Sequence, residues 1–400
     1  PSILREAGAE DADLVLATTN MDEVNMLCAL TAKRLGTKHT IARIRDVAYT
    51  DDLASLRRDL CIDTVINPEY ATASEIFRLL RFPAAVNVDT FFRGKVEMIG
   101  VVVRGQDPIV GVPLSNLFSH THNMSILFSA AEREGEVIIP DGSFVPRVGD
   151  KLYITGTPKD LSAYLRTLGH DLPRIHSVFI IGGSRIAHYL SKTLLSMGVR
   201  VTLVETNEAL CRRLSEWLPG ALVLHGDGTD QELLASEHFT NNDAFIALTG
   251  RDEDNLISSL YAMQQGLRKV IAKCNRENYA SVVRAAGLDC VVAPKLITVA
   301  RILRLVRSLQ DKSGSVMTAL YRIADTGAEA AEFIIHENTP YLGIPLKDLR
   351  IRKGFLIVAL LHDAHVVVPS GTTTLHAGDR VVVISHGQGI QTFHDIFSHS

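Results

Sequence analysis

The chain has 400 residues, enough for about two or three domains of ordinary size. Apolar residues make up 46% and charged residues 22%, so the composition excludes a disordered, collagen-like or coiled-coil chain. The formal net charge of −4 argues against a nucleic-acid-binding chain. No apolar run reaches the roughly 18 residues of a membrane span, so we expect no span.

In chain order, the first stretch alternates short apolar runs with helical patterns. We expect strands at residues 14–17, 40–44 and 65–67, and helices at 24–35, 51–60 and 69–80. Residues 82–94 carry Pro, Gly and charge and predict a boundary. Short strands broken by Gly and Pro follow at 96–104, 125–132, 137–140 and 151–155, typical of a small α+β lobe.

The second half of the chain repeats this order with a longer start. We expect strands at 177–181, 199–205, 221–224, 244–248, 270–273 and 290–293, and helices at 185–197, 209–217, 252–266, 277–286 and 296–309. Strands alternating with helices at this spacing predict right-handed βαβ units in a doubly wound parallel sheet. Residues 310–326 predict a second boundary, and strands at 331–336, 356–361, 366–369 and 380–385 predict a second small lobe.

The two halves are copies of each other. The segment from Asp13 to Asn25 matches the segment from Asp243 to Asn255 at an offset of 230, and both contain an Asp-Glu-x-Asn motif. The offset changes to 226 between Ile66 and Val292, and the Gly-Asp pairs of the small lobes end at Asp150 and Asp379. Matched blocks in one order predict a tandem duplication in which each copy has two lobes.

The copies differ at their starts. The second copy begins near His176, long before its Asp243, whereas the first has only a short segment before Asp13. Residues 2–8 match the helix expected at 232–237. We therefore expect that the first half of the first parallel-sheet lobe is absent and that the chain starts inside a domain.

A glycine-rich turn marks a candidate nucleotide site in the second copy. Residues 182–187 read Gly-Gly-Ser-Arg-Ile-Ala between an expected strand and helix, the context of the dinucleotide fingerprint G-x-G-x-x-G/A. Gly182 and Ala187 fit, whereas Ser184 places a Cβ where the pyrophosphate should approach. Glu205 closes the next strand, where a carboxylate accepts the ribose hydroxyls and repels a 2′-phosphate, which favours NAD or adenosine ligands over NADP.

Further polar residues follow the later strands. Asp227 closes the third strand near the expected adenine edge, and Thr249 and Gly250 end the fourth strand across the switch point. In the first copy the matching candidates are Thr19, Asn20 and Arg43. That copy lacks the glycine turn and its acid, so we expect it not to bind a dinucleotide. Each feature alone also fits a plain strand–helix corner or a solvated strand end.

Other constellations are weak. The pairs His120/His122 and His362/His365 have metal-type spacing but no third ligand nearby, so solvated loops are the favoured interpretation. The five cysteines form no CxxC pair and predict reduced, buried thiols in a cytoplasmic protein, with Cys274 and Cys290 packed. The helix-starting acids Asp22, Glu23, Asp252 and Glu253 suit the helix dipole, and their repetition hints at a shared interface or site.

These features together resemble the TrkA family, the peripheral subunits of bacterial Trk potassium-uptake systems. The resemblance rests on the duplicated Asp-Glu-x-Asn helix after a Thr-ended strand, on Ala42-Arg43-Ile44, on Gly226–Asp230 and on the Gly-Asp hairpins. It implies two tandem regulator-of-K⁺-conductance (RCK) units, each a Rossmann-like N-lobe followed by a TrkA-C lobe. The implied lobes span residues 1–83 (a partial N-lobe), 94–170, 174–309 and 327–400.

The resemblance also implies a site and partners. The ligands would be NAD(H) or ATP/ADP, and the chain would join a cytoplasmic ring of RCK units beneath a membrane-embedded potassium channel subunit. The carried-over ligand residues are Gly182, Gly183, Ser184, Arg185, Ile186, Glu205, Asp227, Thr249, Gly250 and Lys273, with Thr19, Asn20 and Arg43 in the first copy.

Two functional hypotheses remain. A regulatory nucleotide sensor would gate K⁺ flux by shifting a conformational equilibrium. An NAD-dependent oxidoreductase needs a proton donor and a substrate lobe with convergent polar groups. The small lobes offer β hairpins and apolar stretches, with no Tyr-x-x-x-Lys, Ser-His or Cys-His set near the nicotinamide side, so we expect the sensor and no enzyme.

Overall fold

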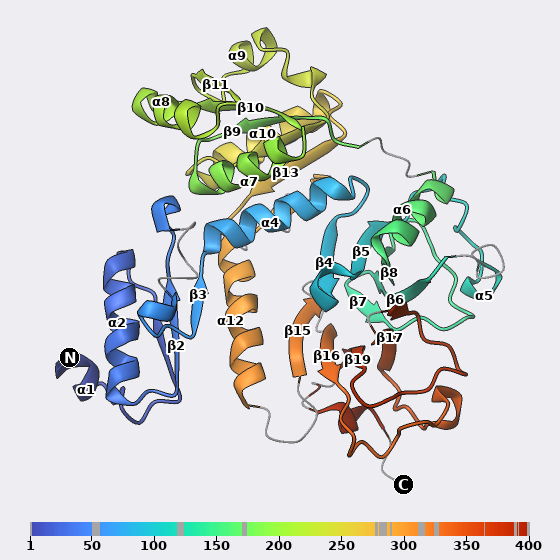
Figure 1. Ribbon diagram of the computed structural model, residues 1–400. Coiled ribbons are helices and arrows are strands. Elements are labelled where there is room, and N and C mark those ends of the chain that lie inside the picture. The colour runs from blue at the N-terminus through green and yellow to red at the C-terminus, as the bar shows by residue number, and fades with distance from the viewer. Residues whose placement is uncertain are drawn as a thin grey trace. The chain divides into compact units, whose positions relative to one another are not determined.

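The structure is a computed structural model that describes residues 2–49, 57–117, 124–169, 174–276, 279, 286–288, 290–310, 317–323, 328–363, 365–387, 390 and 392–397. It divides into two compact units, one of Pro1–Phe77 and Ile175–Thr298 and the other of Arg78–Arg174 and Val299–Ser400 (Figure 1). The first unit holds the parallel sheets and the second holds the antiparallel ones. The division falls within helices α4 (Pro68–Arg81) and α12 (Pro294–Gln310).

A six-stranded parallel sheet organises the second copy. Its strand order is β11-β10-β9-β12-β13-β14, the order of a doubly wound nucleotide-binding sheet, so the predicted fold class is confirmed. The strands are β9 (Ser177–Ile181), β10 (Arg200–Glu205), β11 (Leu222–His225), β12 (Ala244–Ala247), β13 (Lys269–Lys273) and β14 (Val291–Val292). The helices between them are α7 (Arg185–Ser196), α8 (Glu208–Trp217), α9 (Gln231–Ser236) and α10 (Asp252–Gln264), with the short η4 (Phe239–Asn241).

The first copy contributes a three-stranded parallel sheet of order β1-β2-β3. Its elements are α1 (Ser2–Glu6), β1 (Leu14–Ala17), α2 (Asp22–Leu35), β2 (His39–Arg43), η1 (Val47–Tyr49), β3 (Thr64–Ile66) and the start of α4. Leu14 pairs with His39 as Ala244 pairs with Lys269, so the offset of 230 holds in the hydrogen-bond register as well as in the sequence. The expected helices at 51–60 and 277–286 lie largely outside the described residues.

Each small lobe is a five-stranded antiparallel sheet. The first has the order β4-β5-β8-β6-β7 and the second β15-β16-β19-β17-β18. The first comprises β4 (Asn87–Phe91), η2 (Phe92–Gly94), β5 (Val96–Val102), α5 (Leu114–Leu117), β6 (Ile126–Arg133), β7 (Glu136–Ile138), β8 (Lys151–Gly156) and α6 (Pro158–Thr167). The second comprises β15 (Met317–Ile323), β16 (Ala328–Ile334), η5 (Leu346–Asp348), β17 (Phe355–His362), β18 (His365–Val367), β19 (Arg380–His386) and η6 (Phe393–Ile396).

The predicted boundaries at 82–94 and 310–326 are wrong in one respect, because each contains a strand. β4 and β15 form the outer strands of the two small sheets and pair with β5 and β16. In β4 the buried side chains are Val88 and Phe91, and the flanking Pro83 and Gly94 obscure that short pattern. Helix α6 was not predicted, although Thr157 caps it and Pro158 occupies its first turn.

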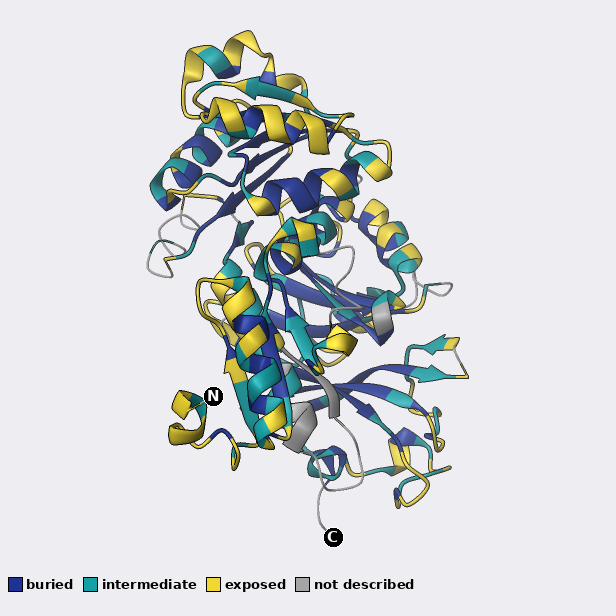
Figure 2. Cartoon of the chain, turned by 60° about the vertical axis from the view of Figure 1, so that its left-hand side comes forward, coloured by how far each residue is buried: buried dark blue, intermediate teal, exposed yellow. Residues whose placement is uncertain are grey.

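The two small lobes share a hydrophobic core. Phe92, Met98 and Tyr153 of the first lobe cluster with Val358 and Val382 of the second, all fully or nearly fully buried. Fully burying a side chain of this size stabilises the fold by about 1.5–3 kcal/mol. Within each unit the strands are mostly buried and the outer helix faces exposed (Figure 2).

The cysteines only partly follow the prediction of buried thiols. All five are free, and Cys211, Cys274 and Cys290 are buried. Cys28 is half-buried and Cys61 is exposed, so the prediction is wrong for these two. Cys61 lies in the turn before β3 with a φ of 52°, outside any strand or helix face that packs on the sheet.

Candidate functional site

The glycine turn between β9 and α7 lies directly against the end of β12. Gly182 has a φ of +91°, and a Cβ there would lie 2.7 Å from the backbone N and Cα of Thr249. Neither the left-handed backbone nor the contact allows a side chain. Strand β9 lies between β10 and β12, so the turn opens at the point where the strand order reverses, where open α/β sheets bind ligands.

Ser184 has a local role that the fingerprint alone did not predict. It is the N-cap of α7, and its hydroxyl accepts the N–H of Ala187 at 3.4 Å. A serine is favoured at this position because its oxygen satisfies a free donor of the first helical turn. Of the next two candidates, Arg185 is exposed and Ile186 is buried, so the side chain of Ile186 packs inward and only its backbone can serve a ligand.

Glu205 lies beside the glycine turn, as the sequence predicted. One carboxylate oxygen accepts the N–H of Gly183 at 2.6 Å, and the other accepts the N–H of Asn207 at 2.8 Å. A Cβ on Gly183 would lie 2.6 Å from a side-chain carbon of Leu214 and 2.9 Å from the Glu205 carboxylate. A side chain at position 183 would therefore require the Leu214 or Glu205 side chain to move away from the turn.

The loop after β11 also reaches the turn. β11 ends at His225, so Asp227 lies just beyond the strand rather than closing it. Asp227 is exposed, and hydrogen bonds from the N–H and hydroxyl of Thr229 lower its pKa. A Cβ on Gly228 would lie 2.6 Å from the side chain of Ile181, so this loop passes close to the end of β9.

A buried asparagine clamps the strand ends on the other side of the site. The Asn255 side chain accepts the N–H of Thr249 at 2.8 Å and donates to the Lys273 carbonyl at 3.0 Å. Burial lowers the pKa of Lys273, which ends β13. Sequence reasoning singled out the repeated Asp-Glu-x-Asn motif but not this role for its asparagine. Gly250, the next candidate, is exposed.

The first copy carries the same clamp. Asn25 accepts the N–H of Thr19 at 2.6 Å and donates to the Arg43 carbonyl at 2.9 Å. The Arg43 guanidinium donates to the Thr19 carbonyl at 2.6 Å, and Asn20 is exposed beside it. The three first-copy candidates therefore lie together at one strand end.

The repeated helix-starting acids anchor a loop. Asp252 accepts the N–H groups of Asn275 and Arg276 at 2.8 and 3.0 Å, and Asp22 accepts the equivalent two groups in the first copy. Glu253 accepts the hydroxyl proton of Tyr279, as Glu23 does from Tyr49. Their repetition thus has a structural cause in addition to the helix dipole.

A contact between the two parallel-sheet lobes was not predicted from the sequence. Tyr189, on the helix that opens at the glycine turn, accepts a hydrogen bond from the Asn67 amide at 3.0 Å. Its hydroxyl donates to the Arg45 carbonyl at 3.3 Å, and its ring lies edge-on to Tyr70. Residues this distant in sequence give no pattern that would reveal the contact.

The remaining candidates have the following places. His120 and His122 lie outside the described residues. His362 and His365 are cross-strand partners at the ends of β17 and β18, and His362 Nδ1 lies 2.6 Å from a carboxylate oxygen of Asp379, so the prediction of a solvated loop without further ligands nearby is wrong. The Cys290 thiol contacts the Lys269 ammonium at 3.1 Å.

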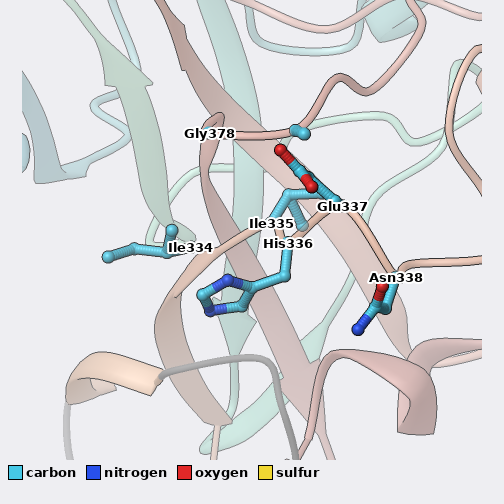
Figure 3. Close-up of a pocket in the computed structure, with 7 residues that line it drawn as sticks. Ile334, Ile335, His336, Glu337, Asn338 and Gly378 are labelled. Atoms are coloured by element: carbon cyan, nitrogen blue, oxygen red, sulfur yellow. The ribbon is translucent and has the colours of Figure 1, made fainter.

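Two hollows stand out among the described residues. One of about 240 Å³ lies between α9 and α10, lined by Thr229, Gln231, Leu234, Asp254, Ile257, Ser258 and Tyr261. The other, about 480 Å³, is open and lies in the second small lobe (Figure 3). It is lined by Ile334, Ile335, His336, Glu337, Asn338, Ala377 and Gly378.

Comparisons with known proteins agree with this architecture. The TrkA-N domain family matches residues 1–68 and 178–294, and the TrkA-C domain family matches residues 330–398. The TrkA homolog of Archaeoglobus fulgidus, a Trk system potassium uptake protein, is 32% identical over 395 residues, 99% of this chain and 87% of that protein. Homolog 2 of Methanosarcina mazei is 30% identical over 97% of this chain and 86% of that protein.

The chain belongs to the TrkA family of Trk system potassium uptake proteins. Azorhizobium caulinodans TrkA is 31% identical over 99% of this chain and 87% of that protein. Among solved structures, the GsuK RCK domain covers 96% of this TrkA-family chain at a TM-score of 0.59 and 19% identity, with 80% of that chain covered. The structure of the GsuK channel bound to NAD covers 95% of this chain at a TM-score of 0.56 and 21% identity, and the match covers 66% of that channel chain. These likenesses show a shared fold.

Across the described part of this TrkA-family chain, no helix combines the length and apolar character needed to cross a membrane.

Proposed function

We propose that the chain is a nucleotide-sensing regulatory subunit that gates a membrane-embedded potassium-uptake partner. Its sensing site would be the turn between β9 and α7, with NAD(H), ATP or ADP as ligand. We keep the division into lobes at 1–83, 94–170, 174–309 and 327–400 as part of this proposal. The chain would act at the inner face of the cell membrane.

One observation carries the proposal: the glycine turn and Glu205 meet where the strand order reverses. The Gly183 N–H and the Glu205 carboxylate are joined at 2.6 Å, next to the first turn of α7. Free N–H groups and the positive end of the helix dipole there suit a phosphate. A carboxylate oxygen has lone pairs left for ribose hydroxyls, and its charge repels a 2′-phosphate.

Further residues supply the rest of the proposed site. Asp227 follows β11 and would face the adenine. Thr249 and Gly250 follow β12 and Lys273 ends β13, so these three would meet the ligand from across the switch point. The Asn255 clamp fixes the spacing between the Thr249 and Lys273 backbones. In the first copy, Thr19, Asn20 and Arg43 would form a contact surface without a full dinucleotide site.

The Tyr189 contact gives the signal a path between lobes. A ligand at the start of α7 acts on the helix whose Tyr189 hydroxyl bonds Asn67 and the Arg45 carbonyl. A ligand that binds one arrangement of the paired lobes better shifts the population toward that arrangement. The relatives that match almost the whole chain are potassium uptake proteins. We therefore expect that the partner that responds to this signal is a potassium channel or transporter.

Exposed apolar side chains at matching positions support self-association. Leu27 on α2 is 62% exposed, and Ile257 on α10, its counterpart at the offset of 230, is 67% exposed. Repeated apolar surface of this kind is typical of symmetric assembly contacts. We infer that these helix faces join RCK units in a ring.

The alternative, an NAD-dependent oxidoreductase, makes a different demand. It needs an acid or base at the nicotinamide side of a bound cofactor, and no described contact singles out such a group. A regulatory function also agrees with the family.

The test is titration of the whole chain with NADH, NAD⁺, NADPH, ATP and ADP, followed by calorimetry and nicotinamide fluorescence. Glu205→Gln keeps an acceptor for the Gly183 N–H but removes the charge. We expect it to narrow the preference for NADH over NADPH by at least about tenfold, corresponding to about 1.4 kcal/mol. Glu216→Gln, an exposed acid on α8, is the matched control and leaves the preference unchanged.

Two outcomes would overturn the proposal. One is that none of the five nucleotides binds the folded chain. The other is steady consumption of NADH with a small carbonyl substrate, which would favour the oxidoreductase.

A further inference from the structure

The two small lobes carry the same buried aspartate at the same corner of the sheet. Asp150 and Asp379 are each 2% exposed and follow the repeated glycine of the hairpin before β8 and β19. The strand pairs that begin at these aspartates keep the same register, with Glu132 opposite Lys151 and Leu361 opposite Arg380. Further along, both pairs carry a β-bulge, between Phe128 and Ala130 and between Ile357 and Ala359, at the offset of 229 that relates the two aspartates. The backbone around the carboxylate is therefore matched in the two lobes, and the side chains that face it can be compared directly.

In the first lobe, the side chain of Arg133 and the backbone of Arg147 hold this carboxylate. The Arg133 guanidinium donates to the two oxygens of Asp150 at 2.8 and 2.6 Å. The Arg147 N–H donates to the same carboxylate at 2.8 Å. Burial alone would raise the pKa of Asp150, but these hydrogen bonds lower it. This arrangement is a satisfied, permanent ion pair with no place for a cation.

In the second lobe, histidines replace both arginines. At the same offset of 229, His362 stands at the position of Arg133 and His376 at that of Arg147. His362 Nδ1 lies 2.6 Å from one oxygen of Asp379, and His376 Nδ1 lies 3.8 Å from the other. The backbone N–H of His376 donates to the Asp379 carboxylate at 2.8 Å, as the backbone N–H of Arg147 does to Asp150 in the first lobe. The two carboxylates are therefore held in the same way by the backbone.

Replacing the two arginines with histidines leaves three side chains that can each bind a metal ion. Each of the three residues offers one donor atom, and these atoms all lie within 4.8 Å of one another. The His362 and His376 rings are 4.8 Å apart and tilted by 47°. Their side chains are 41% and 53% exposed, so an ion can reach them and the imidazoles can turn, while the carboxylate is fixed from within.

We propose that His362, His376 and Asp379 form a binding site for a divalent transition metal ion of the zinc type. Two imidazoles and one carboxylate are the donors such ions prefer, whereas Ca²⁺ and Mg²⁺ prefer oxygen donors throughout. Donor atoms around tetrahedral zinc lie roughly 3.3–3.5 Å apart, given metal–ligand distances of about 2.0–2.2 Å. The observed spacings reach this by small rotations of the two exposed rings, with solvent as the fourth ligand.

The surroundings suit the metal-bound state. Asp363 lies 3.5 Å from His362 Nε2, where it accepts the remaining ring proton when Nδ1 holds the ion. The ion would join the end of β17 to the loop before β19. That loop, Ala377–Gly378, forms one wall of the open hollow of about 480 Å³ (Figure 3), so metal binding would stiffen one side of the hollow.

The first lobe supplies the control variant. The double substitution His362→Arg and His376→Arg copies its ion pair and should keep the fold while removing the ligands. The background is the whole chain with Cys28→Ser and Cys61→Ser, because these two thiols are not buried and bind zinc themselves. The measurement is Zn²⁺ affinity against a chromophoric chelator, with Co²⁺ absorption reporting a tetrahedral nitrogen and oxygen site.

We expect one Zn²⁺ per chain in the background protein, a higher Tm with zinc, and affinity weakened at least tenfold in the double variant. His376→Ala is the second variant and should weaken affinity in the same direction if the double variant misfolds. Zinc affinity that is equal in the background protein and the folded variants would overturn the proposal. Absence of zinc binding in the background protein would overturn it too.

Discussion

The close contact between Gly182 and Thr249 can be tested by adding a single methyl group at Gly182. Gly182→Ala forces a left-handed backbone on alanine, at a cost of roughly 1–2 kcal/mol. The new Cβ would also lie 2.7 Å from two backbone atoms of Thr249, whereas carbon atoms pack at about 3.5–4.0 Å. Because neither partner is a flexible side-chain end, the turn must move. We expect the free energy of unfolding to fall by about 2–4 kcal/mol in total.

Gly198→Ala separates backbone strain from the collision. Gly198 has a φ of +78°, but a Cβ there would have nothing within 4 Å. We expect this variant to lose roughly 1–2 kcal/mol and to keep its nucleotide affinity. Urea unfolding of both variants, with NADH titration of the folded forms, makes the comparison. Equal stability losses with unchanged affinity in both would refute the argument that the turn is pressed against β12.

Two further predictions concern buried groups. Asn255→Ala leaves the Thr249 N–H and the Lys273 carbonyl without their partner, and each unsatisfied buried group costs about 1–3 kcal/mol. Urea unfolding should therefore show a loss of several kcal/mol in the free energy of unfolding. Asn241→Ala, at an exposed position, is the control and should change it very little. Burial and then the nearby Lys192 lower the pKa of His188, so its stabilising effect is present above about pH 6.5 and is lost as the pH falls below that value. In His188→Phe, the urea midpoint should therefore change less between pH 7.5 and pH 5.5 than in the unmodified chain. If the midpoint depends on pH equally in both proteins, other groups cause the acid sensitivity.

The elements that apolar patterning fixes tightly were predicted closely. The expected strand at 177–181 matches β9 residue for residue, and the expected helix at 185–197 differs from α7 by one residue. β9 is fully buried at the centre of the sheet, where a continuous apolar run predicts a strand. α7 follows it directly and is amphipathic, with a buried face that repeats at helical spacing. At the outer strands the pattern is shorter: β4 buries only Val88 and Phe91, which do not alternate, so the flanking Pro83 and Gly94 outweighed them.

The candidate site was predicted in part for a similar reason. Gly182 and Glu205 lie on consecutive elements at a known spacing, so a local pattern is enough to bring them together. Asn255 bonds residues 6 and 18 positions away, and Tyr189 bonds residues more than 100 positions away. Contacts of that kind depend on how strands and lobes pack, which no local pattern records.

The duplication separates fold from function within one molecule. The asparagine clamp occurs in both copies with the same bonds, which is expected if the fold itself requires it. The arginines around Asp150 and the histidines around Asp379 differ on a backbone that is otherwise repeated, bulge included. A change that keeps the backbone and replaces Arg133 and Arg147 with two imidazoles is not explained by the fold, whereas the proposed metal site would account for it. At this corner of the sheet the two small lobes share a backbone and differ in side-chain chemistry, so the zinc titration of the double variant tests what that difference does.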